Sequence, residues 1–196
     1  MWTVLLGLGV LFLLLQTKNY MAANKIHEQS YRVVRQEKEF EIRFYPSVIM
    51  AAITSPLKSY NKLGKAGFSK LAAYIFGGNT TKQHIAMTKP VHMDINDTFS
   101  TMSFVMPSMY SMETLPKPVN LDVEIKASDD EYVAAITFGG FASDKDIAMY
   151  SEKLLAALQA QSITYFGGCR FLGYNPPYQL VGRRNEIIVG VQWPTK

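Results

Sequence analysis

The sequence is poor in cysteine and in charge. Only Cys169 is present, so no internal disulfide can form, and the disulfide frameworks of small secreted domains are excluded. Charged residues make up 18% of the 196 residues, and neither sign gathers into a long run. The net charge of +4 is therefore weak support for an anionic partner, and we expect no nucleic-acid binding. The fold must rest on a hydrophobic core, and this length suffices for one domain.

The motifs of common enzyme classes are missing as well. The chain has no G-x-S-x-G elbow, no cysteine-protease signature around Cys169, and neither a P-loop nor a dinucleotide-binding glycine pattern. His27, His84 and His92 have no cysteine partner at zinc-finger spacing, and we interpret His84 and His92 as ordinary strand residues. The sequence therefore predicts a protein that is not an enzyme and has no metal ligands of its own.

One long hydrophobic run is present, at the N-terminus. Trp2–Leu15 carries no charge, and as a helix it would be about 21 Å long, shorter than the roughly 30 Å hydrocarbon core of a bilayer. No Lys or Arg precedes the run, Lys18 and Lys25 follow it, and Tyr20–Ala23 is a poor cleavage site. We predict that residues 1–25 form a single-helix membrane anchor that faces the domain toward the cytoplasm. A cleaved signal peptide of an exported protein is the alternative.

Residues 30–196 have the pattern of one α+β domain. The strand-like runs are at 31–34, 40–44, 48–54, 82–87, 91–95, 100–106, 121–127, 132–138, 170–174 and 186–192. Helical periodicity predicts one helix over 59–76 and a second from Ser143, where Asp146 completes a capping box. Strands, a helix and more strands thus follow one another twice. This order predicts two similar α/β halves that share one antiparallel sheet or barrel.

Methionines gather before the proline-rich loop at 115–118. They are Met102, Met106, Met109 and Met112. Flexible thioethers line adaptable apolar binding sites, but they also fill irregular cores, so both roles stay open for this group.

Segments along the whole body resemble the SOUL haem-binding family. The opening segment 31–51, YRVVRQEKEFEIRFYPSVIMA, has the family's Tyr-led strand followed by a Glu-x-Arg-x-Tyr strand. The other similar segments, in the family's order, are GFSKLAAYIFGGN at 67–79, IAMTKPV at 85–91, LPKPVNLDVEI at 115–125, FGGFAS at 138–143 and GYNPPYQLVGRRNEI at 173–187. The resemblance implies a twisted antiparallel sheet or distorted barrel with two helices and a pseudo-two-fold repeat, of the type found in SOUL and GyrI-like regulatory domains, and this agrees with the doubled order of elements.

The resemblance also implies a ligand. Family members are named for binding haem or another porphyrin, here expected as a non-covalent cofactor of a carrier or buffer protein, in an apolar cleft beside the first helix. The implied cofactor-binding residues of this chain are Lys65, Phe68, Leu71, Ala72, Met87, Tyr178 and Arg183. The alternative function is an interaction or scaffold module of the same fold, which would bind another small molecule or a protein segment.

Positions in the implied site depart from the family pattern. Phe44 stands where some relatives have a histidine that is proposed as an axial iron ligand. Ala73 and Gln179 stand where other members carry lysines. The resemblance therefore implies a haem held mainly between apolar side chains, with Lys65 or Arg183 as outlying cations and no axial ligand assigned.

Overall fold

The computed structural model describes residues 26–96 and 98–194. The predicted anchor at residues 1–25 lies outside the described residues, so its membrane role stays a prediction. None of the helices within the described residues is long and apolar enough to cross a membrane.

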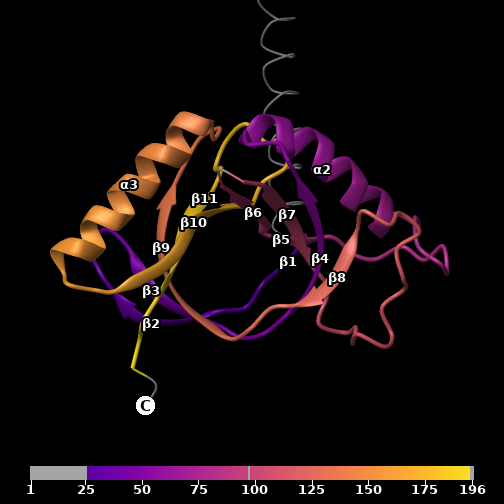
Figure 1. Ribbon diagram of the computed structural model, residues 1–196, viewed down its shortest axis with the longest axis horizontal. Coiled ribbons are helices and arrows are strands. Elements are labelled where there is room, and N and C mark those ends of the chain that lie inside the picture. Colours follow the sequence, from indigo (N-terminus) through magenta and orange to yellow (C-terminus); the bar gives the residue numbers. More distant parts are fainter. Residues whose placement is uncertain (1–25, 97, 195–196) are drawn as a thin grey trace, which may run out of the picture.

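Within the described residues, a nine-stranded antiparallel sheet curls into a half-barrel with the strand order β2-β3-β9-β11-β10-β6-β7-β4-β8 (Figure 1). Its strands are β2 (Arg32–Gln36), β3 (Glu41–Tyr45), β4 (Ile49–Ser55), β6 (Val91–Ile95), β7 (Ser100–Val105), β8 (Glu124–Ala127), β9 (Glu131–Phe138), β10 (Tyr165–Gly173) and β11 (Asn185–Val191). A separate parallel pair joins β1 (His27–Glu28) to β5 (Thr88–Lys89). The sheet is therefore the framework on which every other element is placed.

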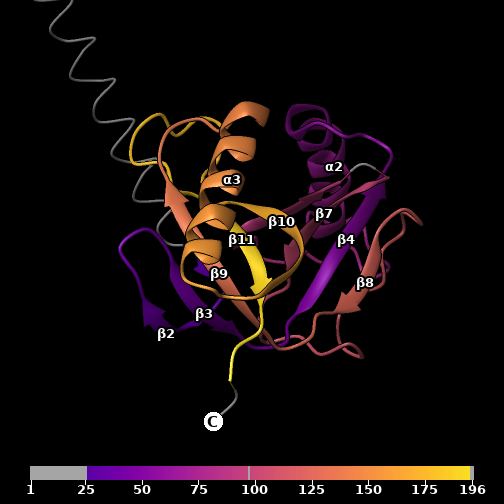
Figure 2. The ribbon, with the colours of Figure 1, turned by 60° about the vertical axis from the view of Figure 1, so that its left-hand side comes forward.

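Helices α2 (Tyr60–Ile75) and α3 (Asp144–Ala160) cover the outer face of the sheet (Figures 1 and 2). The predicted apolar stripe of α2 is buried, namely Leu63, Gly67, Leu71, Tyr74 and Ile75. Helix α3 begins at the predicted capping box, in which the Ser143 hydroxyl accepts from the Asp146 N–H and the Asp146 carboxylate accepts from the Ser143 N–H. Amphipathic periodicity thus placed both helices correctly on the core.

The two halves of the domain repeat one arrangement. In the first half, β4 is followed by α2 and the pair β6 and β7, and β4 pairs with β7. In the second half, β9 is followed by α3 and the pair β10 and β11, and β9 pairs with β11. The antiparallel pair β6 and β10 joins the halves. The predicted fold class and its doubled pattern are confirmed.

The predicted strand at 82–87 is wrong. The chain there is irregular: a turn at residues 79–82 is followed only by an isolated bridge at His84 before β5. The side chain of Asn79 is the physical reason, because its amide donates to the Gln83 carbonyl and its oxygen accepts from the Gln83 N–H. Lys82 takes a left-handed conformation, with φ at 54°. These side-chain bonds satisfy the backbone locally and compete with strand pairing.

Two other strands differ in extent from the prediction. Strand β10 begins at Tyr165, ahead of residue 170, because a shift in register between Phe166 and Arg170 lets the strand continue past an irregularity. Strand β8 begins at Glu124, later than residue 121, because the Val123 N–H donates to the Asn120 carbonyl in a turn.

The two faces of the sheet have different chemistry. The outer face and the helices enclose the main apolar core. A second, smaller cluster lies on the opposite face, which we call the inner face; its members are Tyr45, Val133, Ala135, Leu172, Tyr174 and Ile188. Because alternate residues of a strand share a face, Arg43 and Glu186 lie on the inner face as well.

Candidate functional site

The predicted site residues of α2 differ in exposure. Lys65 is exposed, Ala72 is half-buried, and Phe68 is 37% exposed. The ring of Phe68 packs edge-on against Phe104, with 5.3 Å between the ring centroids. Leu71 is completely buried and supports the helix from beneath. Their spacing places Lys65, Phe68 and Ala72 on one side of the helix.

Arg183 and Tyr178 lie on the loop between β10 and β11. The Arg183 guanidinium donates to the carbonyl oxygens of Pro176 and Gln179 at 2.7 and 2.8 Å, and lies 4.3 Å from the ring centroid of Phe141. Burial lowers the pKa of Arg183. Tyr178 is 59% exposed. Arg183 thus holds the loop in shape, whereas Tyr178 presents its ring to the outside.

Met87 lies on a third segment of the chain, apart from α2 and the β10–β11 loop. It is half-buried ahead of β5 and packs against the main core. The residues predicted from the sequence therefore form a helix group, a loop pair and this single methionine.

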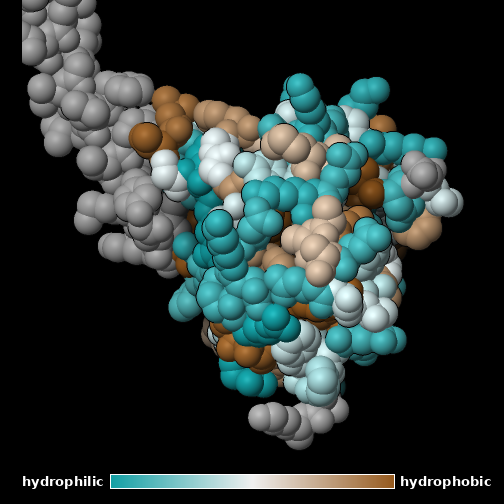
Figure 3. Space-filling view, turned by 90° about the vertical axis from the view of Figure 1, so that its left-hand side faces the viewer, coloured by the Kyte–Doolittle hydropathy of each residue, from teal (hydrophilic) through white to brown (hydrophobic). Residues whose placement is uncertain are grey.

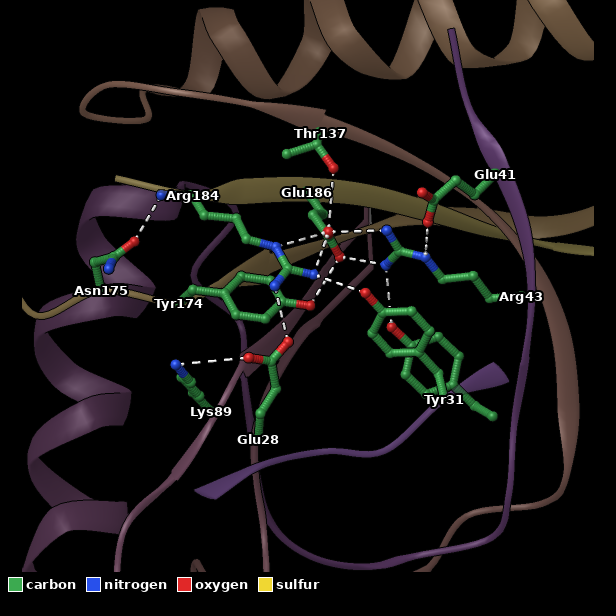
Figure 4. A network of polar contacts seen from close by, with 11 residues as sticks. Glu28, Tyr31, Glu41, Arg43, Lys89, Thr137, Tyr174, Asn175, Arg184 and Glu186 are labelled. Carbon is green, nitrogen blue, oxygen red and sulfur yellow. Dashed lines mark hydrogen bonds and ion pairs between the residues drawn. The ribbon is translucent and has the colours of Figure 1, made fainter. Parts of the chain in front are cut away.

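The inner face carries a buried ionic network (Figure 4). Glu186 on β11 is fully buried, and its carboxylate accepts two hydrogen bonds from Arg43 on β3 at 2.8 and 3.1 Å. The Arg184 guanidinium donates to the same carboxylate at 3.0 and 2.8 Å. Hydroxyls of Thr137 and Tyr174 donate to it as well. The carboxylate is saturated by donors from four segments of the chain.

The network keeps its charges at neutral pH. Burial alone would raise the pKa of Glu186, but the hydrogen bonds and charges of Arg43 and Arg184 outweigh burial and lower it. Burial likewise opposes the charge of Arg43, yet Glu186 raises the pKa of that guanidinium. Burial raises the pKa of Tyr45 to about 12. The arrangement is that of a structural unit, since none of these groups exchanges a proton near pH 7.

Residues 27–31 close the inner face, and we call them the N-terminal strap. The Glu28 carboxylate accepts from Arg184 at 2.8 Å and lies 3.5 Å from the ammonium of Lys89 (Figure 4). The Tyr31 hydroxyl accepts from Arg184 at 3.1 Å. Arg184 therefore joins the strap to the buried network.

A histidine fastens the middle of the strap. His92 Nε2 lies 2.7 Å from Gln29 Oε1, which fits a neutral imidazole that donates from Nε2. Burial, assisted by the charge of Arg170, lowers the pKa of His92 to about 3. His84 is exposed beside the ring of Phe76. Among the described residues, no cluster of three or more His, Cys, Asp or Glu side chains could hold a metal ion.

Two hollows on the surface of the described residues differ in size. A cleft of about 650 Å³ lies between the strap, the β3–β4 turn and the segment after β7, and Ile49, Met106, Met109, Tyr110 and His27 are among its lining residues. A groove of about 340 Å³ lies between α3 and the middle strands and contains Cys169. Burial raises the pKa of the Cys169 thiol. The implied haem-binding residues line neither hollow, but Met106 and Met109, for which the sequence left a site-lining role open, line the larger cleft.

Sequence reasoning missed the network, and of the larger cleft it indicated only Met106 and Met109. Arg183 and Arg184 both donate hydrogen bonds within the protein. One signal was available. Glu186 begins an apolar strand, and a carboxylate in that position requires a buried cationic partner.

Relatives with assigned names cover most of the chain. Heme-binding protein 1 of Xenopus laevis is 26% identical over 180 residues, which cover 87% of this chain and 94% of the relative. Heme-binding protein 2 of Homo sapiens is 26% identical over 170 residues, which cover 82% of each protein.

Solved structures with the same fold are more distant in sequence. The C-terminal domain of EcmrR has a TM-score of 0.59 at 8% identity and covers 84% of this chain and 99% of that domain. An uncharacterized conserved protein from Listeria innocua has a TM-score of 0.59 at 10% identity and covers 80% and 93%. At such identities the likeness shows the fold alone.

The family profile described as SOUL heme-binding protein matches residues 26–190. The match spans the strap, both helices and both halves of the sheet. The chain belongs to the SOUL heme-binding protein family.

Proposed function

We propose that this protein binds haem or a related tetrapyrrole without covalent attachment and serves as a carrier or buffer for it. The observation that carries the proposal is the family match over residues 26–190, together with relatives named for heme binding that cover most of the chain. The structure offers two places with suitable chemistry.

The first place is the exposed side of α2. Phe68 offers a flat apolar surface that Phe104 supports from behind, and Ala72 leaves room beside it for a planar ring. Lys65 lies one turn away and is exposed, so it can pair with a propionate. Tyr178, Arg183 and Met87 lie on other segments of the chain and are further proposed contacts of the ligand.

The second place is the larger cleft. Its volume of about 650 Å³ lies within the range of about 300–1,000 Å³ typical of small-molecule sites. Met109, Tyr110 and His27 line it, and thioether, phenol and imidazole groups are all known ligands of haem iron. Ile49 and Met106 add apolar walls. The cleft therefore supports the same function at a different location.

Support for a non-catalytic role comes from the buried reactive groups. The Cys169 thiol has a pKa raised by burial, the imidazole of His92 is neutral and bonded to Gln29, and the Glu186 carboxylate is saturated with donors. None of these three groups is prepared to act as a nucleophile or a general base at neutral pH.

Haemin titration of the full chain tests the function and separates the two places. We expect a saturable shift of the Soret band, and a fall in affinity of about tenfold or more, equivalent to about 1.4 kcal/mol, in either Phe68→Asp or Met109→Asp. Leu121→Asp is the matched control, because Leu121 is 98% exposed and lies outside both places. Absence of a saturable shift rejects haem binding. A shift that neither variant weakens rejects both locations.

A further inference from the structure

We propose that the tip of the β10–β11 loop docks into the surface of a lipid bilayer. The apolar tip consists of Tyr178, Leu180 and Val181 together with Phe141 from the β9–α3 connection. These side chains are 59%, 48%, 65% and 57% exposed. The loop lies at the upper left of Figure 2, and brown side chains gather in the same corner of the space-filling view (Figure 3). Tyr178 is also a proposed haem contact, so the docking proposal rests on Leu180, Val181 and Phe141, and these three do not belong to either proposed haem site.

The loop is built with its polar groups inside. Gln179 is 1% exposed, and its amide donates to the carbonyl oxygens of Val181 and Gly182 at 3.0 and 3.3 Å. Arg183 donates to the carbonyls of Pro176 and Gln179. A carbonyl that enters lipid loses its water, and it must find a donor within the protein. The loop supplies such donors to the carbonyls of Pro176, Gln179, Val181 and Gly182, so this part of its backbone does not depend on water.

The apolar tip is held as one surface. The Arg183 guanidinium over the ring of Phe141 connects the two loops. The Asn185 side chain donates to the Gly140 carbonyl at 2.9 Å, and the Asn175 side chain accepts from the Arg184 N–H at 2.6 Å. Because the loops are fixed to the sheet by these bonds, docking requires little further ordering of the chain.

The chain outside the described residues indicates a bilayer as the occupant. Glu28 pairs with Arg184 at the foot of the loop. The apolar run Trp2–Leu15 ends a short distance before Glu28, and an extended chain of that length reaches at most about 45 Å. An inserted run would therefore keep the apolar tip close to the same membrane and raise its effective concentration there.

Exposed lysines flank Tyr60 at the start of α2. Tyr60 begins α2 close enough to Arg183 for the charge to act on its hydroxyl, and the exposed Lys58 and Lys62 flank Tyr60. The first turn of α2 contains no acidic residue, although a helix N-terminus favours negative charge. Asp144, on α3, accepts a hydrogen bond from the Tyr60 N–H at the start of α2. Exposed lysines in this position suit contact with anionic headgroups.

A position-specific probe on the full chain tests the docking. In a Cys169→Ser background, Val181→Cys carries an environment-sensitive fluorophore, and Leu121→Cys carries the same fluorophore as the matched control. The protein is bound to phosphatidylcholine–phosphatidylserine vesicles that contain a doxyl-labelled lipid. We expect a blue shift and strong quenching at position 181 and neither at position 121, although both proteins have the same N-terminal run.

Equal quenching at the two positions overturns the proposal, as does failure of the full chain to bind the vesicles. If the tip binds a protein instead of lipid, the vesicles leave the probe at position 181 unquenched, and this result also overturns the proposal. Leu180→Asp, made in the Val181→Cys protein, is expected to reduce quenching at least several-fold, and an unchanged signal contradicts insertion of the tip. Haemin titration of the same variants shows whether haem binding is intact, so the two proposals fail separately.

Discussion

At the scale of single residues, Glu186 is the most demanding group to bury. Its side chain is fully buried, and Arg43, itself 2% exposed, supplies two of its hydrogen bonds. Removing one partner of a buried ion pair costs about 3–5 kcal/mol, because the other charge stays desolvated. We expect Arg43→Ala to reduce the free energy of unfolding in urea by roughly this amount.

The control for this variant is an ion pair at the surface. Lys153 and Glu39 are 3.2 Å apart, and both side chains are nearly half exposed. Lys153→Ala should change the free energy of unfolding by less than about 1 kcal/mol. Similar losses in Arg43→Ala and Lys153→Ala would show that Arg184 alone is sufficient to satisfy Glu186.

The buried imidazole of His92 makes stability depend on pH. Its folded-state pKa of about 3 lies below the usual value of about 6.5, so the unfolded chain binds the proton more readily between these values. Stability is therefore lost as the pH falls below about 6.5, at up to about 1.4 kcal/mol per pH unit. Glu186 adds a loss only below about pH 4.3, because its folded pKa is lowered from the usual glutamate value.

Unfolding in urea at pH 7 and pH 5 isolates the histidine. We expect His92→Gln to lose less stability than the wild type between these two conditions. His84→Gln, at an exposed site, should keep the wild-type difference. If His92→Gln keeps it as well, the loss at pH 5 arises from another group.

The burial of single residues was predictable where the helical period alone determines it. The positions 63, 67, 71, 74 and 75 of α2 follow from helical periodicity alone, and all are buried. Arg43 and Glu186 are separated by 143 residues, so no local pattern could pair them. The exposure of Phe68 beside the buried Leu71 follows from how α2 lies on β7, which is tertiary information.

At the scale of elements, α3 owes its first turn to the capping box of Ser143 and Asp146. Ser143→Ala removes the acceptor of the Asp146 N–H and should lower the free energy of unfolding by about 0.5–2 kcal/mol. The matched control is Ser69→Ala, in the middle of α2, where the hydroxyl bonds only to the Lys65 carbonyl of its own helix. Alanine favours a helix interior, so Ser69→Ala should be neutral or slightly stabilising in thermal unfolding. Equal destabilisation by both variants would contradict the cap.

Elements were predictable where side-chain pattern and backbone bonding agree. Strands β6 and β7 lie close to their expected positions, because alternation marks both strands. The expectation failed at 82–87, where Asn79 bonds to the backbone and makes a turn out of a strand-like sequence. This side-chain contact forms because α2 ends just before Asn79, and the β-strand propensity of residues 82–87 does not reveal it.

At the scale of the whole molecule, the doubled order of elements was enough to predict the architecture. A strand, a helix and a strand pair occur twice in this order. Strands β6 and β10, one from each half, pair antiparallel and complete one sheet. The shape of the larger cleft was not predictable, although Met106 and Met109 were indicated, because the strap, the β3–β4 turn, the segment of Ala86 and Thr88 and the segment after β7 reach it from four parts of the sequence. Such a cleft exists only after folding has brought these segments together.

Gln29 attaches the strap to His92 on β6, so a substitution of this one side chain should weaken the attachment of the strap to the sheet. Gln29→Ala leaves His92 Nε2 buried without the oxygen that now lies 2.7 Å away. An unpaired buried group of this kind costs about 1–3 kcal/mol, which corresponds to a roughly 5- to 150-fold rise in local opening. In amide hydrogen exchange, peptides that contain residues 27–31 should lose protection by this factor, whereas β9 keeps its protection. Ser30→Ala, at an exposed neighbour, is the control. Loss of protection in both the strap and β9 would mean that the strap and the sheet open together as one unit.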